Sequence, residues 1–483
     1  MQSIFEQSRR GGRTAVRAAL SGEDLSDLPV RFLRKSSAGL PEVTELQAVK
    51  HYTRLSRRNL SSDTGLNSLA SCTFNYHPGA ALALASLPEF LVRHPEAPEG
   101  HSQGFMACVY DLQELIKAVT GMPGASLAPA AGAQCEFAGI AMIKAYHDAR
   151  NDADRTEILI PETAQAAAAV PAEMCGYSVR KLPVGSEGSV DVAILENFLG
   201  SRTAGLMLTN PSTVAVFACN TEAIAGLVHE AGGLLNCTGD NLSAIAGKNR
   251  PDDMGIDVIT LDLHKCFCAP RGGGGPGAGA VAVSERLLPY LPAPMVDREG
   301  DAYTWLDEQR RPESVGRFSA FAGNAGILLR AYIAALMLGR KGMRRAAEYS
   351  TMNASYLRRQ LLKSGFDAAY PERGVAHEVI LNLRCPTGEG VATRDYAKRL
   401  LDYGVHVPTT LLPPQATECL LLEPTGAESK EMLDSFVAAM RAIRDEAETD
   451  PDTVRGAPYT MPVGRLDEGA LVDADLTWKP TNG

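Results

Sequence analysis

An alternation of short apolar runs with amphipathic stretches, between about residues 105 and 330, most constrains how this chain can fold. Runs of strand length occur at 156–161, 178–184, 204–212, 233–239 and 257–264. Segments with helical spacing occur at 105–122, 132–150, 192–200 and 222–232. Strands that alternate with helices usually pair in parallel and are covered on both faces, so the pattern predicts an α/β domain with a mostly parallel sheet. In such a sheet the ligand lies at the carboxyl ends of the strands.

The chain of 483 residues divides into four predicted segments. Residues 1–88 mix short helical stretches with Gly, Pro, Ser and recurring apolar residues, which favours an ordered N-terminal arm around a partner over a disordered tail. Residues 89–330 form the large domain. Residues 331–450 contain two long helical patterns around strand-like runs, which indicates a smaller C-terminal α+β domain, and residues 451–483 form a C-terminal tail on the surface.

Composition argues against several classes of protein. The formal net charge is −10 and basic blocks are absent, so neither nucleic acid nor an anionic membrane is an expected partner. No apolar run approaches the roughly 20 residues that span a bilayer. The N-terminus lacks the apolar segment of a secretory signal, and the ten cysteines form no Cys-x-x-Cys pair. We therefore expect a cytoplasmic protein with reduced thiols and no metal site.

The strongest local signal is a strand-like run that ends in His264 and Lys265, followed by four glycines at 272–275. A lysine that faces a cleft at a strand end can be desolvated, which exposes a nucleophilic amine. Such an amine forms a Schiff base with an aldehyde cofactor, above all pyridoxal phosphate. On pattern alone, a surface lysine before a loop is an equal alternative. The glycines are not a nucleotide-binding P-loop, because no Gly-Lys-Ser/Thr follows them.

A second signal lies at 129–139, where small residues lead into a helix. Backbone N–H groups at a helix start can hold a phosphate, and Ala133 and Gln134 are placed for this role. An ordinary strand–helix turn is the alternative.

The whole chain resembles the glycine dehydrogenase (decarboxylating) P-protein family, in particular the second, C-terminal-half subunit of two-subunit bacterial forms. The resemblance runs almost end to end. The matching stretches include SIFEQSRRG, LPEVTELQAVKHYTRLSRRN, PAAGAQ, LMLTNPST, HEAGGLL, DLHK, RGGGGPG and SVGRFSAFAGNAGILLRAY.

This resemblance implies a fold-type-I, aminotransferase-like pyridoxal phosphate enzyme with residues 89–330 as the cofactor-binding domain. It makes Lys265 the Schiff-base lysine, places His264 beside the cofactor phosphate, and adds Asn210 to the cofactor-binding residues. It also implies a partner, either a subunit-1-like chain in a heterodimer or a second copy in a homodimer.

The chain departs from the family pattern where an aspartate pairs with the pyridine nitrogen of the cofactor, because Thr238 occupies that place. A threonine hydroxyl cannot supply the charge that stabilises a protonated ring. Asp240 lies two residues further on, and would share a face with Thr238 if the strand persists. Asp240 as a turn or N-cap carboxylate is an alternative of at least equal weight.

Further departures lie around the expected pocket. Gln165 stands where the family has a histidine that stacks on the cofactor ring, and Asn75 stands where it has a lysine. Arg271 replaces a histidine and is a candidate clamp for a substrate carboxylate, with a surface ion pair as the alternative. Cys266 and Cys268 are best interpreted as small core residues.

These departures predict a glycine decarboxylase scaffold diverted to another amino-acid substrate in specialised metabolism, with elimination, replacement or carbon–carbon bond formation at the α-carbon. One alternative is a true glycine dehydrogenase (decarboxylating) subunit 2, for which a lipoyl H-protein is the expected partner. A second alternative is a non-catalytic subunit that completes a partner's site.

Overall fold

The computed structural model of the chain describes residues 2–9, 28–36, 39–61, 64–66, 77–94, 97–164, 166–185, 187–212, 214, 216–239, 242–267, 277–383, 390–410 and 418–466. Contacts divide the chain into two compact units, one made of 1–61 with 458–483 and the other of 62–457. The first unit contains the helix α1 (Glu45–Ser56). This helix begins where it does because the Thr44 hydroxyl accepts the Gln47 N–H while the Gln47 side chain accepts the Thr44 N–H.

The second unit is built around a seven-stranded sheet with the strand order β1-β7-β6-β5-β4-β2-β3. Neighbouring strands pair in parallel from β3 through β6, while β7 is antiparallel to both β6 and β1. The strands are β1 (Gly124–Ser126), β2 (Glu157–Pro161), β3 (Ser178–Leu182), β4 (Thr203–Thr209), β5 (Leu234–Thr238), β6 (Val258–Asp262) and β7 (Gly279–Val283).

Helices cover the sheet on both sides, because alternate strand residues face opposite ways. Leu159 and Leu206 belong to one buried cluster with residues of α4 (Gln103–Thr120) and α8 (Thr221–Glu230). Ile158 and Met207 belong to another with residues of α5 (Gly132–Asp148). The shorter helices are α2 (Gly79–Ala85), α3 (Pro88–Leu91), α6 (Val170–Met174), α7 (Val192–Glu196), α9 (Leu242–Ile245) and α10 (Leu263–Cys266).

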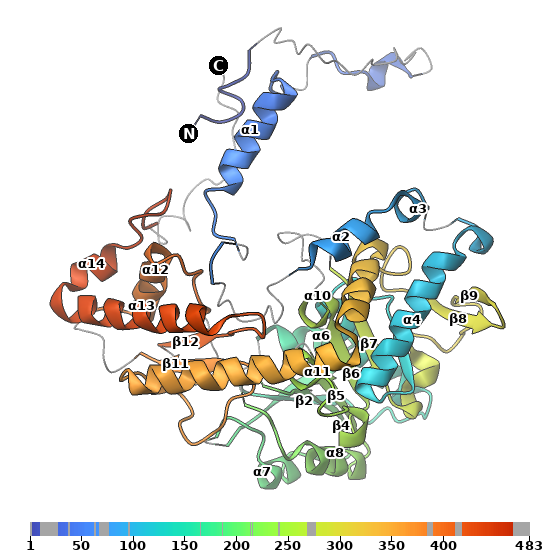
Figure 1. The fold of residues 1–483 in the computed structure, drawn as a ribbon. Coiled ribbons are helices and arrows are strands. Elements are labelled where there is room, and N and C mark those ends of the chain that lie inside the picture. Colours follow the sequence, from blue (N-terminus) through green and yellow to red (C-terminus); the bar gives the residue numbers. More distant parts are fainter. Residues whose placement is uncertain are drawn as a thin grey trace. The chain divides into compact units, whose positions relative to one another are not determined.

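A long helix, α11 (Ala325–Lys363), links the large sheet to a smaller α+β region (Figure 1). It is kinked at Gly339, whose φ of 58° is non-helical. Its first half contributes to the core under the large sheet and its second half to a separate core. That second core contains residues of β11 (Val379–Asn382), β12 (Cys419–Leu422), α12 (Thr393–Asp402), α13 (Lys430–Thr449) and α14 (Pro451–Gly456), and the short strand β10 (Asp367–Ala368) pairs with β11. A hairpin of β8 (Met295–Glu299) and β9 (Ala302–Leu306) lies against α4.

The predicted α/β architecture with a mostly parallel sheet and a smaller C-terminal α+β region is confirmed. The prediction of a strand over 257–264 was too long, because β6 ends at Asp262 and the next four residues form the helical turn α10. The antiparallel strand β7 was not predicted. The boundaries at 88, 330 and 450 stay predictions, and α11 runs across the second of them. Within the described residues, no helix is both long and apolar enough to cross a bilayer.

Candidate active site

Lys265 lies at the carboxyl end of β6, on the short helical turn α10. Only 8% of its surface is exposed. Its Nζ is 3.4 Å from Oδ2 of Asp262, the last residue of the strand. A buried ammonium group costs a large desolvation free energy unless an opposite charge lies beside it, and Asp262 supplies that charge. The structure thus places a lysine amine, largely shielded from water, where a parallel sheet binds its ligands.

Asp262 also lies beside His264, with 3.5 Å between His264 Nε2 and Asp262 Oδ2. The same carboxylate lies against the first turn of α5, because a Cβ built on Gly132 would be 2.4 Å from Asp262 Oδ1. Only a glycine leaves room for that approach. Asp262 therefore connects the lysine, the histidine and the start of α5, a role that the sequence analysis did not assign.

The start of α5 has the features of an anion-binding helix end. Ala131 is the N-cap and has no side-chain acceptor, so the first-turn N–H groups are not capped by that residue. Gln134 Oε1 accepts the Ala130 N–H at 2.7 Å, which fixes the turn that leads into the helix. Ala133 lies in the first turn, as predicted. Gln134 therefore shapes the turn through its oxygen.

Thr238 lies at the carboxyl end of β5, in parallel register with Thr260 of β6. Its hydroxyl donates to Oε1 of Glu136 on α5, with 3.2 Å between the oxygens. Both side chains are half-buried. Glu136 was missed by the sequence analysis, since nothing local in the sequence shows that an α5 carboxylate reaches β5.

Asn210 follows β4 and begins a cis peptide bond with Pro211. Its amide group donates to Thr221 Oγ1 at 2.9 Å and accepts the Ala218 N–H at 3.0 Å. These bonds hold the loop that leads to α8. A cofactor contact by Asn210 stays a prediction, and the contacts here give it a loop-holding role.

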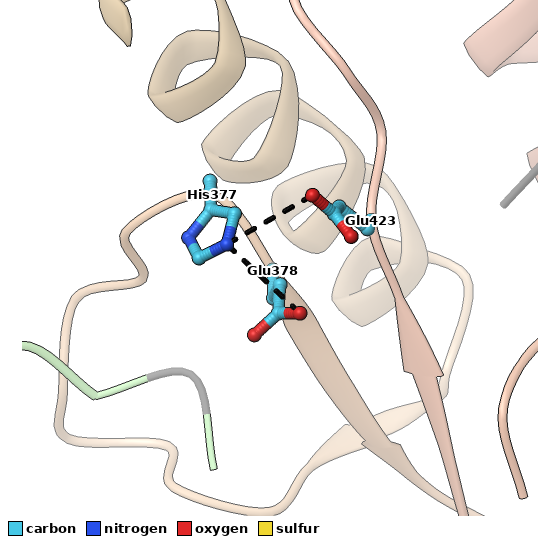
Figure 2. A group of neighbouring side chains, drawn as sticks. All are labelled: His377, Glu378 and Glu423. Atoms are coloured by element: carbon cyan, nitrogen blue, oxygen red, sulfur yellow. Dashed lines mark ion pairs between the residues drawn. The ribbon is translucent and has the colours of Figure 1, made fainter. Parts of the chain in front are cut away.

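A second group of ionisable side chains, His377, Glu378 and Glu423, is buried at the start of β11 and the end of β12 (Figure 2). His377 Nε2 lies 3.9 Å from a carboxylate oxygen of each glutamate. Burial lowers the pKa of His377 to about 3, so the imidazole is neutral at physiological pH. Burial and the neighbouring Glu423 raise the pKa of Glu378 well above its ordinary value, while the positive charge of Lys265 opposes that rise. The small C-terminal region therefore brings a carboxyl group within electrostatic range of the lysine.

Four of the predicted site residues, together with Cys268, lie outside the described residues, and their placement stays a prediction: Asn75, Gln165, Asp240 and Arg271. Cys266 is buried, in agreement with its interpretation as a core residue.

Two family models match the chain. The glycine cleavage system P-protein model matches residues 39–379, and the glycine dehydrogenase C-terminal domain model matches residues 346–455. The chain belongs to the glycine cleavage system P-protein family. A relative in Thiobacillus denitrificans, named probable glycine dehydrogenase (decarboxylating) subunit 2, is 53% identical over 479 residues and aligns across 99% of each chain. A second relative of the same name, in Thioalkalivibrio sulfidiphilus, is 55% identical over 480 residues, and the alignment covers 99% of this chain and 97% of the relative.

Solved structures place this family member among the fold-type-I enzymes. An inhibitor-bound glycine decarboxylase (P-protein) aligns with a TM-score of 0.72 at 20% identity, covering 87% of this chain and 94% of its own. An aspartate aminotransferase from Thermus thermophilus aligns with a TM-score of 0.58 at 16% identity, covering 79% of this chain and 99% of its own. At these identities the likeness shows the fold, and it confirms the predicted fold type.

Pyridoxal phosphate is the cofactor of this family and of the fold-type-I neighbours, and the chain is an enzyme that depends on it. The residues present fit this group. The buried amine of Lys265 matches its aldehyde, and the α5 N-terminus, which Ala131 leaves without a side-chain cap, matches its phosphate. His264 lies near the turn that leads into α5, because a Cβ on Gly277 would be 3.5 Å from both His264 Nδ1 and Ala130 O.

Proposed function

We propose that this chain decarboxylates glycine as the second subunit of a two-subunit P-protein, with pyridoxal phosphate held on Lys265. The observation that carries the proposal is the buried lysine at the end of β6, which contacts Asp262 beside the start of α5, a helix whose N-cap Ala131 has no side-chain acceptor. It occurs in a chain that aligns from end to end with relatives named glycine dehydrogenase (decarboxylating) subunit 2.

Each residue of the site has a role that follows from its position. Lys265 is the amine that holds the cofactor, and Asp262 orients that amine and balances its charge. The first-turn N–H groups of α5 and His264 bind the phosphate, and Gln134 keeps the preceding turn in shape. When bound, the cofactor supplies an aldehyde carbon for the lysine and an electron-accepting ring that weakens the bonds at the substrate α-carbon.

Glycine is the substrate that the comparisons favour over the predicted diverted one. That prediction rested on the changes at positions 75, 165, 238 and 271, and three of these lie outside the described residues. Relatives at 53% and 55% identity across the whole chain give no support for another substrate or for specialised metabolism. By the same reasoning, a subunit-1 chain and a lipoyl carrier protein are the proposed partners.

The test is exchange of labelled bicarbonate into the carboxyl group of glycine, measured with purified protein, a subunit-1 chain, pyridoxal phosphate and a lipoylated carrier. We expect exchange with the native chain and none with Lys265→Ala. Lys144→Ala serves as the control, because the Lys144 side chain is 44% exposed and forms its ion pair with the exposed Asp148 of the same helix. A cofactor-loaded protein that turns over a different amino acid and never exchanges glycine would refute the proposal.

Borohydride reduction followed by peptide mapping provides a separate test of the lysine. The cofactor label is expected on the peptide that contains Lys265. A label on any other lysine would overturn the assignment, whatever the substrate.

A further inference from the structure

The hydrogen bond between Thr238 and Glu136 lies in a part of the site that the predicted residues do not account for. Helix α5 crosses the sheet so that its residues lie in turn over β5 and β6. A Cβ on Gly139 would be 3.1 Å from Asn236 Oδ1, Glu136 contacts Thr238, and Gly132 lies against Asp262. The absence of a side chain at Gly139 lets the helix approach the strand closely. That approach brings the Glu136 carboxylate to the carboxyl end of β5.

The Thr238 hydroxyl can act as a relay at this point. A hydroxyl has one proton to donate and lone pairs with which to accept. Its proton is directed to Glu136, which leaves the oxygen able to accept a hydrogen bond from a cationic N–H. Hydrogen bonds linked in this way polarise one another, and a carboxylate at the far end favours the charged form of the donor.

The cofactor has such a group in its pyridine nitrogen, which works best as part of an electron sink when it is protonated. The ring nitrogen lies across the ring from the aldehyde carbon, so its partner must be sought away from Lys265. Asp262 lies at the lysine itself, and His264 lies near the turn before α5, where the phosphate is expected. Glu378 belongs to the C-terminal region and acts electrostatically on Lys265. Glu136 is the described carboxylate that is hydrogen-bonded to the end of β5.

We propose that Glu136 is a positioning residue that, through the Thr238 hydroxyl, keeps the ring nitrogen of the bound cofactor protonated. This inference rests on the proposed function only in requiring pyridoxal phosphate on Lys265. It assigns a role to a carboxylate on α5, and it makes Thr238 the hydrogen-bonding link between that carboxylate and the cofactor ring.

The experiment measures the protonation of the ring nitrogen directly, by ¹⁵N NMR of protein loaded with ring-labelled pyridoxal phosphate across a pH series. We expect a protonated nitrogen in the native protein at neutral pH. Glu136→Gln keeps the shape and hydrogen-bonding atoms of the side chain but removes its charge, and should lower the pKa of the ring nitrogen by about 1–3 units. Thr238→Val removes the relay at nearly constant volume and should do the same.

Two further variants make the experiment decisive. Thr238→Asp in the Glu136→Gln background places a carboxylate at the end of β5 and should restore the protonated nitrogen. Asp148→Asn removes an exposed carboxylate near the other end of α5 and should change nothing. Cofactor affinity, measured by fluorescence titration at a pH where the ring nitrogen is protonated in both proteins, should fall about tenfold in Glu136→Gln for each unit by which the ring pKa is lowered.

The inference fails if the native nitrogen is neutral at neutral pH, or if Glu136→Gln leaves the pKa of the ring nitrogen unchanged. Loss of protonation in Asp240→Asn but not in Glu136→Gln would transfer the role to Asp240 and also overturn the inference. If borohydride labelling finds no cofactor on Lys265, both the inference and the proposed function fail. If the cofactor is on Lys265 and glycine is not exchanged, the NMR result still decides the role of Glu136.

Discussion

Replacing Gly132 with alanine tests the geometry on which the whole cofactor site depends. A Cβ at this position would lie 2.4 Å from Asp262 Oδ1 and 2.7 Å from its Cγ, well inside van der Waals contact. Because Asp262 ends a buried strand and contacts Lys265 and His264, its carboxylate cannot move without disturbing both. Overpacking of this kind costs about 1–3 kcal/mol.

An opposing effect must be subtracted. Alanine in a helix is favoured over glycine by up to about 1 kcal/mol, although less at the first helical position. The clash therefore dominates, and we expect Gly132→Ala to lower the free energy of unfolding by about 1–2 kcal/mol. Cofactor affinity should fall as well, because the displaced carboxylate no longer orients Lys265.

A matched control is Gly226→Ala, which lies in α8 with open space where the added methyl group would be placed. This change should stabilise the protein by about 0.5–1 kcal/mol, since only the helix preference acts. Urea unfolding and pyridoxal phosphate titration, run on both variants, measure the two effects. If Gly132→Ala matched Gly226→Ala in stability and bound the cofactor like the native protein, the contact between α5 and Asp262 would not exist.

Three other outcomes follow from the site and its surroundings. Asp262→Asn should slow capture of the cofactor by Lys265 about tenfold or more, because the side chain of Lys265 loses the ion pair that orients it, and the absorbance of the bound cofactor follows the rate. Burial raises the pKa of Asp257, but hydrogen bonds from His229 and from the Leu235 N–H lower this pKa by more, so the net pKa is below its ordinary value. The charged Asp257 therefore stabilises the fold above about pH 4, and this stabilisation is lost as the pH falls further. Asp257→Asn should accordingly reduce the steepness of acid unfolding below about pH 4, as measured by circular dichroism. Glu378→Gln should change the free energy of unfolding at pH 7 by less than about 1 kcal/mol, because an uncharged amide replaces a carboxyl whose pKa burial has raised.

The elements of the large domain could be predicted because their signals are local. Helical spacing in 105–122 and 222–232 corresponds to α4 and α8, and the short apolar runs before and after the second segment correspond to β4 and β5, which α8 connects. The strand β7 has the composition Gly-Ala-Val-Ala-Val, whose small residues resemble a loop continuing from the glycines before it. Lys265 was predicted to be the Schiff-base lysine because two signals agreed, its position after a strand-like run and the resemblance of the surrounding sequence to the family.

The contact of Asp262 with Lys265 was not predicted, because the end of the preceding strand was predicted two residues too late. A strand continued through residue 264 would place residues 262 and 265 on opposite faces of the sheet, since side chains alternate. In the observed structure β6 ends at Asp262, and the helical turn α10 places residues three apart on the same side. The ion pair between Asp262 and Lys265 is therefore a consequence of where the strand stops, which the run of apolar residues does not reveal.

The contact between the two buried glutamates of the C-terminal region depends on the register of two strands, and the local sequence predicts register even less well than it predicts where a strand ends. Val379 of β11 is paired with Leu422 of β12 in antiparallel register, so one step further along the same ladder places Glu378 beside Glu423. Like charges opposite each other on neighbouring strands are destabilising, and burial increases that cost. The neutral His377 between them cannot balance two negative charges. Burial and Glu423 therefore favour the protonated form of Glu378, and the positive charge of Lys265 opposes that effect, so the C-terminal region and the lysine influence each other electrostatically.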